Sequence, residues 1–340
     1  MAVAPSAQAT FPGQNGKIAF WGSGGINVIE PDGSGQALLI PGGRGPAWSA
    51  DGSRLVYFDL AGYPVIPGAL SVANADGSGH TVLRTSTVIS NESFQNEDQF
   101  LEPAWAPDGR VIAYGEVDNT CAPRVGCHFS PEGIREISRD GSGDRRLLRA
   151  PASDPAYSPD GAKIAWTDRF VFAFDRIHVS ASDGTSDTVL AVDGNGLAFD
   201  PSWSPDGSRI AFTNFPTVNG ACCLGAEIYV MNADGANQTR LTFSDVPDDV
   251  DPVWSPDGTK IAWSREGRLW TMNADGTEQA PLGADPIPGV EPDWQPLVGP
   301  RRADYKNASH FCKAEREFLG EQQFRQKYGN HGGCVSGRRG

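Results

Sequence analysis

Short apolar segments recur along the whole chain and are separated by tight polar turns, most often Pro-Asp-Gly or Asn-Ala-Asp-Gly. In "PVWSPDGTKIAWS", which begins at Pro252, an aromatic segment and an apolar "KIAW" segment lie on either side of Pro-Asp-Gly. Short β-rich segments on both sides of such a turn are typical of a β-hairpin. The apolar residues do not repeat at helical spacing, so the pattern predicts strands for most of the chain.

The hairpin unit occurs in five complete copies. They are "PAWSADGSRLVYF" from Pro46, "PAWAPDGRVIAYG" from Pro103, "PAYSPDGAKIAWT" from Pro155, "PSWSPDGSRIAFT" from Pro201 and the copy from Pro252. Each is followed by a second pair of short strands, as in "EIYVMNADG" and "TRLTF", so we expect four strands in each period. Copies 40 to 57 residues apart with four strands each indicate the blades of a β-propeller.

The two ends of the chain hold complementary parts of one more unit. Residues 16–40 contain the last three strands of a blade but no Trp strand, and "PDWQPL" from Pro292 contains only the Trp strand. If these parts pair, the ring closes and no sheet edge stays open. We therefore predict an all-β fold, a six-bladed β-propeller closed by N- and C-terminal strands in one blade, followed by a short helical tail.

The repeated "(D/E)PxWSPDGxxIAF", followed by "xIYVMNADG" and "xxLT", resembles the TolB-like six-bladed propeller, also called the WD40-like PD40 repeat, from Phe11 to about Val298. The resemblance implies the fold but not a function, because propellers of this kind serve as binding platforms, as enzyme side-domains and occasionally as lyases. TolB proteins also carry an N-terminal α/β domain that we do not find in these 340 residues, so the resemblance does not imply a role in an outer-membrane Tol-Pal system.

The composition fits this interpretation and limits the partners. The chain has 41 Gly, 26 Pro and 39% hydrophobic residues, as expected for many short strands around a real core. Its net charge is -14, which argues against nucleic-acid binding. From Arg301 onward nine Lys and Arg stand against four Asp and Glu, so a basic tail follows an acidic body. No apolar run is long enough to predict a transmembrane helix.

The beginning of the chain, "MAVAPSAQATF", lacks an apolar core, yet "AQA" before Thr10 has the small-x-small form of a signal-peptidase site. We interpret residues 1–10 as the remnant of an export signal or as a disordered start, residues 11–298 as the propeller and residues 299–340 as a basic, Cys-containing helical tail. Six cysteines also fit a chain exported to an oxidising compartment. We expect a secreted, periplasmic or cell-envelope protein, and a monomer.

Most residues of the repeat have a structural role. We expect the Trp or Tyr at positions 48, 105, 157, 203, 254 and 294 to fill the space between blades. The turn aspartates are expected to bond to backbone N–H groups; they are Asp51, Asp108, Asp160, Asp206 and Asp257. The basic residues beside the turns are expected to be solvated or turn partners; they are Lys17, Arg54, Lys163, Arg209 and Lys260.

An acidic residue stands directly before the Pro of most copies and forms the candidate site. These residues are Glu102, Asp154, Asp200, Asp251 and Glu291, with Gly45 at the sixth position. The ring brings them together at one mouth of the channel, where they are predicted either to accept N–H bonds from the neighbouring blade, to bind a cation such as Ca²⁺, or to attract a basic segment of a partner. The nearby acidic residues Asp98, Asp248 and Asp249 contribute to the last two hypotheses.

Four long connections are predicted on the same face, where binding loops usually lie: residues 60–69, 85–101, 116–133 and 214–226. The segments "YPVIPG" and "FVFAF" (170–174) either present apolar side chains to a ligand or pack beneath the loops.

Cys121 and Cys127 lie in one of these connections and are expected to form a local disulfide rather than a zinc site. Cys222 and Cys223 form a vicinal disulfide, remain free or pair elsewhere, and the sequence leaves the choice open. Catalytic signatures such as GxSxG and HExxH are absent. His178 and His80 are expected to lie in strands, and His178 to be packed rather than catalytic.

The tail from Tyr305 has apolar residues near helical spacing and predicts a short helix or helical pair, which a Cys312–Cys334 disulfide would stabilise. It resembles a Cys-bearing segment at the C-termini of some exported bacterial proteins. Its positive charge favours docking onto the acidic body or contact with an anionic envelope polymer, with a merely solvated tail as the alternative.

Together these observations predict a non-catalytic, extracytoplasmic binding scaffold that presents a loop-rich acidic face to a protein or peptide partner. No cofactor is expected apart from a possible Ca²⁺. The alternative is an enzyme, a glycan lyase or hydrolase or a peptidase-like protein, that acts at the channel mouth. A pocket in which two carboxylates meet a His or Arg would favour the enzyme.

Overall fold

The structure is a computed structural model. It describes residues 10–59, 68–86, 88–91, 94–122, 126–149, 151–168, 175–190, 197–215, 225–244, 248–283, 287–300, 305, 307–328 and 330–336. The chain divides into two compact units, Met1–Pro296 and Leu297–Gly340, and each is described by itself.

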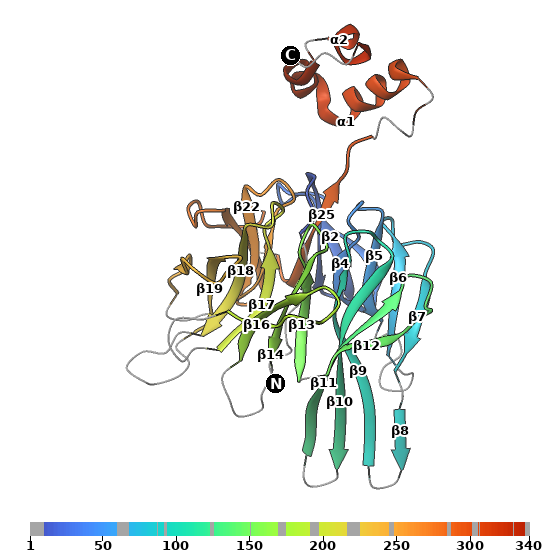
Figure 1. The fold of residues 1–340 in the computed structure, drawn as a ribbon, viewed down its shortest axis with the longest axis vertical. Coiled ribbons are helices and arrows are strands. Elements are labelled where there is room, and N and C mark those ends of the chain that lie inside the picture. Colours follow the sequence, from blue (N-terminus) through green and yellow to red (C-terminus); the bar gives the residue numbers. More distant parts are fainter. Residues whose placement is uncertain are drawn as a thin grey trace. The chain divides into compact units, whose positions relative to one another are not determined.

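In the described residues the strands of the first unit form six antiparallel sheets, which are the blades of a propeller (Figure 1). Blade 1 contains β4 (Gly43–Trp48), β5 (Arg54–Asp59), β6 (Ala69–Asn74) and β7 (Thr81–Thr85). Blade 2 contains β8 (Val88–Asn91), β9 (Phe94–Trp105), β10 (Val111–Ala122), β11 (Gly126–Ser138) and β12 (Arg145–Leu148). Blade 3 contains β13 (Ala152–Tyr157), β14 (Lys163–Asp168), β15 (Arg176–Ala181) and β16 (Thr188–Val189).

Blade 4 contains β17 (Leu197–Trp203), β18 (Arg209–Phe215), β19 (Glu227–Asn232) and β20 (Thr239–Arg240). Blade 5 contains β21 (Asp249–Trp254), β22 (Lys260–Arg265), β23 (Arg268–Asn273) and β24 (Ala280–Pro281). Blade 6 contains β25 (Val290–Leu297), β1 (Gln14–Gly22), β2 (Gly25–Ile29) and β3 (Ala37–Pro41).

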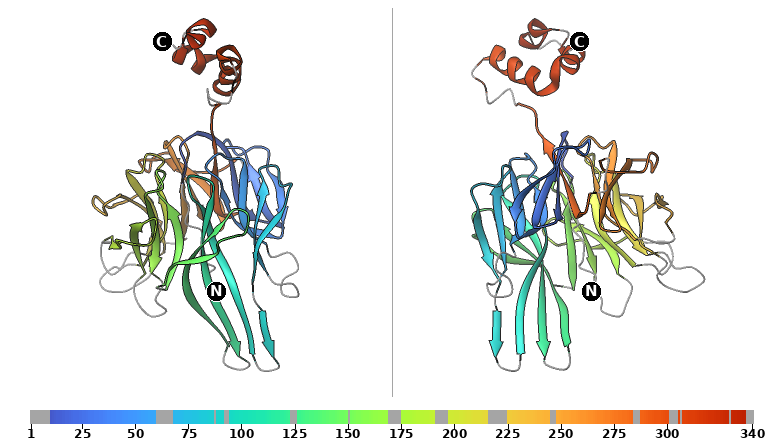
Figure 2. Two further views of the ribbon diagram at one scale, coloured as in Figure 1. Left: turned by 45° about the vertical axis from the view of Figure 1, so that its right-hand side comes forward. Right: turned by 180° about the vertical axis from the view of Figure 1, so that it is seen from behind.

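Blade 6 closes the ring as the sequence predicted. Its strand order is β25-β1-β2-β3, so the last strand of the propeller pairs with the first (Figure 2). The ring has two ends. We call the end with the Pro-Asp-Gly and Asn-Ala-Asp-Gly turns the turn face, and the opposite end, where the inner strands begin, the loop face.

Blade 2 departs from the prediction of four strands and two long loops. Residues 85–101 and 116–133 were expected to be loops, but β8, β9, β10 and β11 run through them as a sheet that projects beyond the ring on the loop face (Figure 1). The antiparallel register of β9 and β10 continues as far as Gln95 and Cys121. The sequence "FQNEDQFL" lacks the alternation that marks a half-buried strand, which is why the pattern did not reveal this extension.

The predicted structural roles of the repeat are confirmed. All six Trp or Tyr residues of the repeat are buried. The Trp105 indole donates to the Ala47 carbonyl of the previous blade at 3.2 Å, and the Trp203 indole does the same to Ala156 at 3.1 Å. The turn aspartates each accept a backbone N–H two residues further on. Arg209 stacks over the Trp254 ring of the next blade at 4.5 Å, so this basic position also packs between blades.

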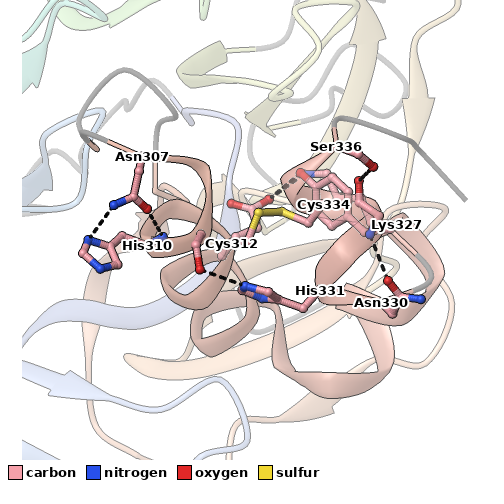
Figure 3. The surroundings of a disulfide bond; sticks show 12 residues. Asn307, His310, Cys312, Lys327, Asn330, His331, Cys334 and Ser336 are labelled. Atoms are coloured by element: carbon pink, nitrogen blue, oxygen red, sulfur yellow. Dashed lines mark hydrogen bonds and ion pairs between the residues drawn. A yellow bond between two sulfur atoms is a disulfide. The ribbon is translucent and has the colours of Figure 1, made fainter.

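The second unit is a small helical tail. Helix α1 (Ala308–Tyr328) is broken at Gly320, where φ is 73°, and is followed by α2 (His331–Val335). The predicted Cys312–Cys334 disulfide is present and is buried beside Phe324 (Figure 3). In the described part of the chain no helix has the length and apolarity needed to cross a membrane.

Candidate functional site

The acidic residues before the prolines occupy equivalent places near the start of each inner strand, at the loop face. We call this set the inner ring: Gly45, Glu102, Asp154, Asp200, Asp251 and Glu291. All six have left-handed backbone, with φ between 52° and 59°. The register of the inner strand pair shifts at this point in blades 1 to 5, so the ring residue and the proline after it form a β-bulge there.

The inner ring links neighbouring blades through hydrogen bonds. Glu291 accepts the Gly45 N–H at 2.9 Å, Asp251 accepts the Glu291 N–H at 3.0 Å, and Glu102 accepts the Asp154 N–H at 2.9 Å. The Asp251 N–H donates instead to the Thr213 hydroxyl at 3.3 Å. One of the three predicted roles, acceptance of a neighbouring N–H, is therefore observed for three of the five carboxylates.

Several carboxylate oxygens of the ring are not used by these bonds. The five acidic residues are between 0 and 4% exposed. Among the described residues, three of these oxygens have no hydrogen-bond partner: both carboxylate oxygens of Asp154 and the Oδ1 of Asp251. Buried polar atoms in this condition are rare in folded proteins and point to a missing partner.

At two members of the ring, Asp251 and Glu291, the electrostatics favour the neutral carboxyl form. Burial raises the pKa of Asp251 well above its ordinary value, and the charges of Glu291 and Asp154 add to the rise. Burial also raises the pKa of Glu291, although Arg44, 3.6 Å away, and the Gly45 N–H oppose it. A positive group placed at the ring would reverse this balance and favour ionisation.

Within the described residues no group of three or more His, Cys, Asp or Glu side chains is arranged to hold a metal ion. Ca²⁺ binding stays a prediction.

The turn-face end of the ring is crossed by the residues that precede β1, which sequence reasoning did not identify. Thr10 is 1% exposed, and its hydroxyl donates to the Trp254 carbonyl of blade 5 at 3.1 Å. Phe11 is 3% exposed and belongs to the buried cluster that contains Ala47 and Trp105 of blades 1 and 2. Thr10 is thus bonded to blade 5, while Phe11 belongs to a core cluster formed by blades 1 to 3. The Gly13 N–H donates to the Pro256 carbonyl at 3.1 Å and holds the same segment just before β1.

A pocket of about 400 Å³ lies at the loop face between blades 5 and 6. Its lining includes Asp248 and Glu266, which are exposed, and Val250 and Val290, which directly precede the inner-ring residues Asp251 and Glu291. The remaining lining residues are Gly225, Ser264 and Gly267. The pocket therefore borders the inner ring and carries two carboxylates, and its lining in the described part of the chain includes neither His nor Arg.

The three additional acidic candidates separate in the structure. Asp248 lines the pocket and accepts the Ala226 N–H at 2.8 Å. Asp249 is 0% exposed and is not among the residues that line the pocket. Its carboxylate accepts hydrogen bonds from the Trp263 indole at 2.8 Å and from Arg265 at 2.6 Å. Asp98 is the register partner of Asp118 in the blade 2 extension, and its side chain lies outside the described residues.

The other cysteine predictions fall in the loop-face connections. Cys121 and Cys127 are direct register partners across β10 and β11, which agrees with a local disulfide, but their side chains lie outside the described residues. Cys222 and Cys223, most of "YPVIPG", and residues 170–174 lie outside the described residues as well.

His178 is packed, as predicted, but it is also ion-paired. It is 6% exposed, stacks on Trp166 at 4.1 Å, and lies 3.1 Å from Asp168 and 3.0 Å from Asp187. Burial lowers its pKa, but hydrogen bonds to both carboxylates outweigh this effect and raise the pKa above the ordinary value. The prediction for His80 was wrong: it is exposed and stands just before β7, where its ring contacts the Tyr57 hydroxyl at 2.5 Å.

Comparisons with known proteins agree with this architecture. Residues 133–298 match the family model of the TolB beta propeller domain. A comparison with curated protein sequences finds no match. Among solved structures, TolB from Acinetobacter baumannii is similar with 19% identity and a TM-score of 0.62, over 83% of this chain and 67% of that chain.

Two further structures share the fold. A chain of a Nidogen/Laminin complex has 15% identity and a TM-score of 0.57, over 80% of this chain and 92% of that one. Oligogalacturonate lyase from Vibrio parahaemolyticus has 12% identity and a TM-score of 0.51, over 82% of this chain and 78% of that one. At these identities the likeness shows the fold alone, which serves both binding proteins and enzymes.

Proposed function

The chain is a TolB-like six-bladed β-propeller, and we propose that it is a non-catalytic extracytoplasmic scaffold. Its loop face would bind a basic segment of a protein or peptide partner. The observation that carries the proposal is the loop-face pocket, where the exposed Asp248 and Glu266 stand beside the buried carboxylates of the inner ring. The loop face carries this pocket, whereas Thr10 and Phe11 are buried toward the turn-face end of the ring.

The pocket chemistry suits a short peptide with a Lys or Arg side chain. Two exposed carboxylates offer charge-assisted hydrogen bonds to an ammonium or guanidinium group, and Val250 and Val290 offer apolar contact to its methylene stem. The blade 2 extension would add backbone contacts on the same face, since its outer strand β8 pairs on one side only among the strands that the structure describes. The acidic net charge of the chain would attract such a partner over longer distances.

Selection of peptides from a displayed library of random linear sequences tests this function. We expect basic peptides to be enriched on the wild-type protein and their binding to weaken with salt. In the double variant Asp248→Asn, Glu266→Gln the affinity should fall about fivefold to thirtyfold, the value expected for two partly exposed charge pairs. Glu278→Gln, an exposed acid on the turn face, is the matched control and should bind like the wild type.

Enrichment of neutral or acidic peptides, or equal affinity for the wild type and the double variant, would contradict the proposal. The rival proposal, an enzyme that cleaves a glycan or peptide at the channel mouth, needs an acid and a base that converge on one bond. The described pocket supplies two carboxylates without His or Arg, and binding is therefore the function we prefer.

The proposed compartment and the role of the tail follow from separate features. The disulfide Cys312–Cys334 supports a secreted, periplasmic or cell-envelope location, since such bonds persist in oxidising compartments. Contact of the basic tail with an anionic envelope polymer is a further proposal. Glu321 already pairs with both Arg316 and Arg325 at 2.5 Å, which leaves less free positive charge than the sequence suggests. We propose a monomer, which sedimentation would test.

A further inference from the structure

We propose that a pocket in the helical tail binds a phosphodiester group of an anionic envelope polymer. The pocket has a volume of about 330 Å³ and is lined by Arg316, Glu321, Phe324, Arg325, Asn330 and His331. This inference deepens the proposed contact of the tail with such a polymer and rests on that part of the proposed function. It does not depend on the binding of a partner at the loop face.

The pocket is formed by separate segments of the tail. Arg316 belongs to the part of α1 before its break, and Arg325 belongs to the part after it. Asn330 and His331 lie where α2 begins, and the disulfide ties α2 back to α1 (Figure 3). The Phe324 ring is 1% exposed and lies 5.9 Å from the Arg316 guanidinium. The basic side chains therefore line a cavity in a crosslinked fold and are not scattered over a flat surface.

A shared carboxylate holds the two arginines of the pocket in place. Glu321 accepts the Nε–H of Arg316 on Oε2 and the Nε–H of Arg325 on Oε1, both at 2.5 Å. Hydrogen bonds from Arg325 and Arg316 lower the pKa of Glu321, so its carboxylate stays ionised. In the described part of the chain, the two terminal nitrogens of Arg325 have no protein partner, and they are available to a ligand.

The charge of the pocket fits a phosphodiester better than a phosphate monoester. Two arginines and one glutamate leave one net positive charge. A phosphodiester carries one negative charge, which this pocket balances. A monoester carries nearly two negative charges at neutral pH, and one of them would lack a counter-charge.

The arrangement of donors favours phosphate over carboxylate. A carboxylate is planar and is best bound by a single guanidinium in the same plane. Here the donors belong to three segments: Arg316, Arg325 and the Asn330 amide, whose Oδ1 already accepts the Gly333 N–H at 2.9 Å. Donors that approach from several directions suit the tetrahedral oxygens of a phosphate group.

Binding of the full chain to immobilised poly(glycerol phosphate), measured by biolayer interferometry at low salt, tests the inference. We expect the wild type to bind this polymer more tightly than poly-glutamate, which also carries one negative charge per unit. Arg325→Gln should weaken the binding about fivefold to tenfold, the loss expected for one partly exposed charge-assisted hydrogen bond. Arg325 is exposed and Gln is an equally good helix former, so this variant keeps its fold.

Lys313→Gln is the matched control. Lys313 also pairs with a Glu four residues away, but it does not line the pocket, so its loss should change the affinity by less than about twofold. The loop-face variant Asp248→Asn, Glu266→Gln should bind the polymer like the wild type, and Arg325→Gln should keep its binding of basic peptides. The two proposed sites can therefore fail separately.

Four results would overturn the inference. Absence of binding by the wild type would remove the proposed polymer contact of the tail together with the pocket. Equal weakening in Arg325→Gln and Lys313→Gln would assign the binding to the general charge of the tail, and equal affinity for poly-glutamate would remove the preference for phosphate. Tighter binding to vesicles of phosphatidylglycerol than to the polymer would assign the phosphodiester to a lipid headgroup.

Discussion

The replacement Asp293→Ser tests whether a buried carboxylic acid at the closing blade makes the stability of the propeller depend on pH. The other copies of the repeat have Ala, Ser or Val at this position, and only "PDW" in blade 6 has an acid. Asp293 accepts the N–H of Trp48 in blade 1 at 2.5 Å and the N–H of Trp294 at 2.8 Å. Burial nevertheless raises the pKa of Asp293 to about 8.

The magnitude follows from the two pKa values. An exposed Asp in the unfolded chain has a pKa near 3.9, so at pH 7 the folded carboxyl holds a proton that the unfolded one has lost, at a cost of about 4 kcal/mol. The contribution of Asp293 to stability is therefore fully present below about pH 4 and is lost as the pH rises to about 8. Serine accepts one N–H, as Ser202 does for Trp254 at 3.4 Å, and gives up one hydrogen bond of about 1 kcal/mol.

These numbers predict two stability curves that cross. Asp293→Ser should be less stable than the wild type at pH 4 and more stable by roughly 4 kcal/mol at pH 8, with equality near about pH 4.6. Urea unfolding followed by tryptophan fluorescence across this pH range measures both curves. Asp251 and Glu291 titrate in both proteins, so their contributions cancel in the comparison. Parallel curves would refute the reasoning and would show that the two N–H bonds keep Asp293 ionised.

Three other changes test the remaining features. Asp249→Asn should destabilise the propeller by about 3–5 kcal/mol in urea unfolding because it breaks a buried ion pair. Asp248→Asn keeps the oxygen that accepts a hydrogen bond and should cost less than about 1 kcal/mol. Equal losses of stability would contradict the different roles of these two adjacent residues. His178→Gln should destabilise the protein more at about pH 5.5 than at about pH 9. The pKa of His178 is raised in the folded protein, so protonated His178 stabilises the fold fully below its unfolded pKa near 6.5, and this contribution is lost as the pH rises through its folded pKa. A loss of stability that does not depend on pH would show that only the packing of His178 matters. Cys312→Ser should cost the helical tail about 3 kcal/mol, seen as faster limited proteolysis after residue 300, and unchanged cleavage would assign tail stability to its helices alone.

The ring closure was predictable because it depends on local repeats. Each blade carries its own turn signals and apolar strands, and the ends of the chain supply the missing parts of one blade, so counting copies gave six blades. The blade 2 extension was not predictable in the same way. Its strands pair with each other over a long register, and the polar residue pattern carries little trace of such pairing.

The candidate site was predictable in part. The acids before Pro were identified from their repetition, and the ring placed them together as expected. The segment at Thr10 and Phe11 was missed because it occurs once and has no repeat to reveal it. Asp248 and Asp249 show the limit most clearly: they are adjacent and chemically identical, but only the strand register decides that one lines the pocket and the other pairs with Arg265.

The left-handed backbone of the inner ring accounts for glycine in one blade and favours Asp in three others, whereas Glu102 and Glu291 are retained for the N–H bonds that they accept from the next blade. Such φ values disfavour most side chains, but glycine adopts them freely and Asp is among the residues that tolerate them. The bulge turns the N–H of each ring residue toward the preceding blade, where a carboxylate one blade back can accept it, as Asp251 does for Glu291. Once this bond uses one oxygen, the second oxygen has no backbone donor left. The same geometry that joins the blades therefore leaves unused acceptors near the axis, and a cationic group from this chain or from a partner is the complement that their charge requires.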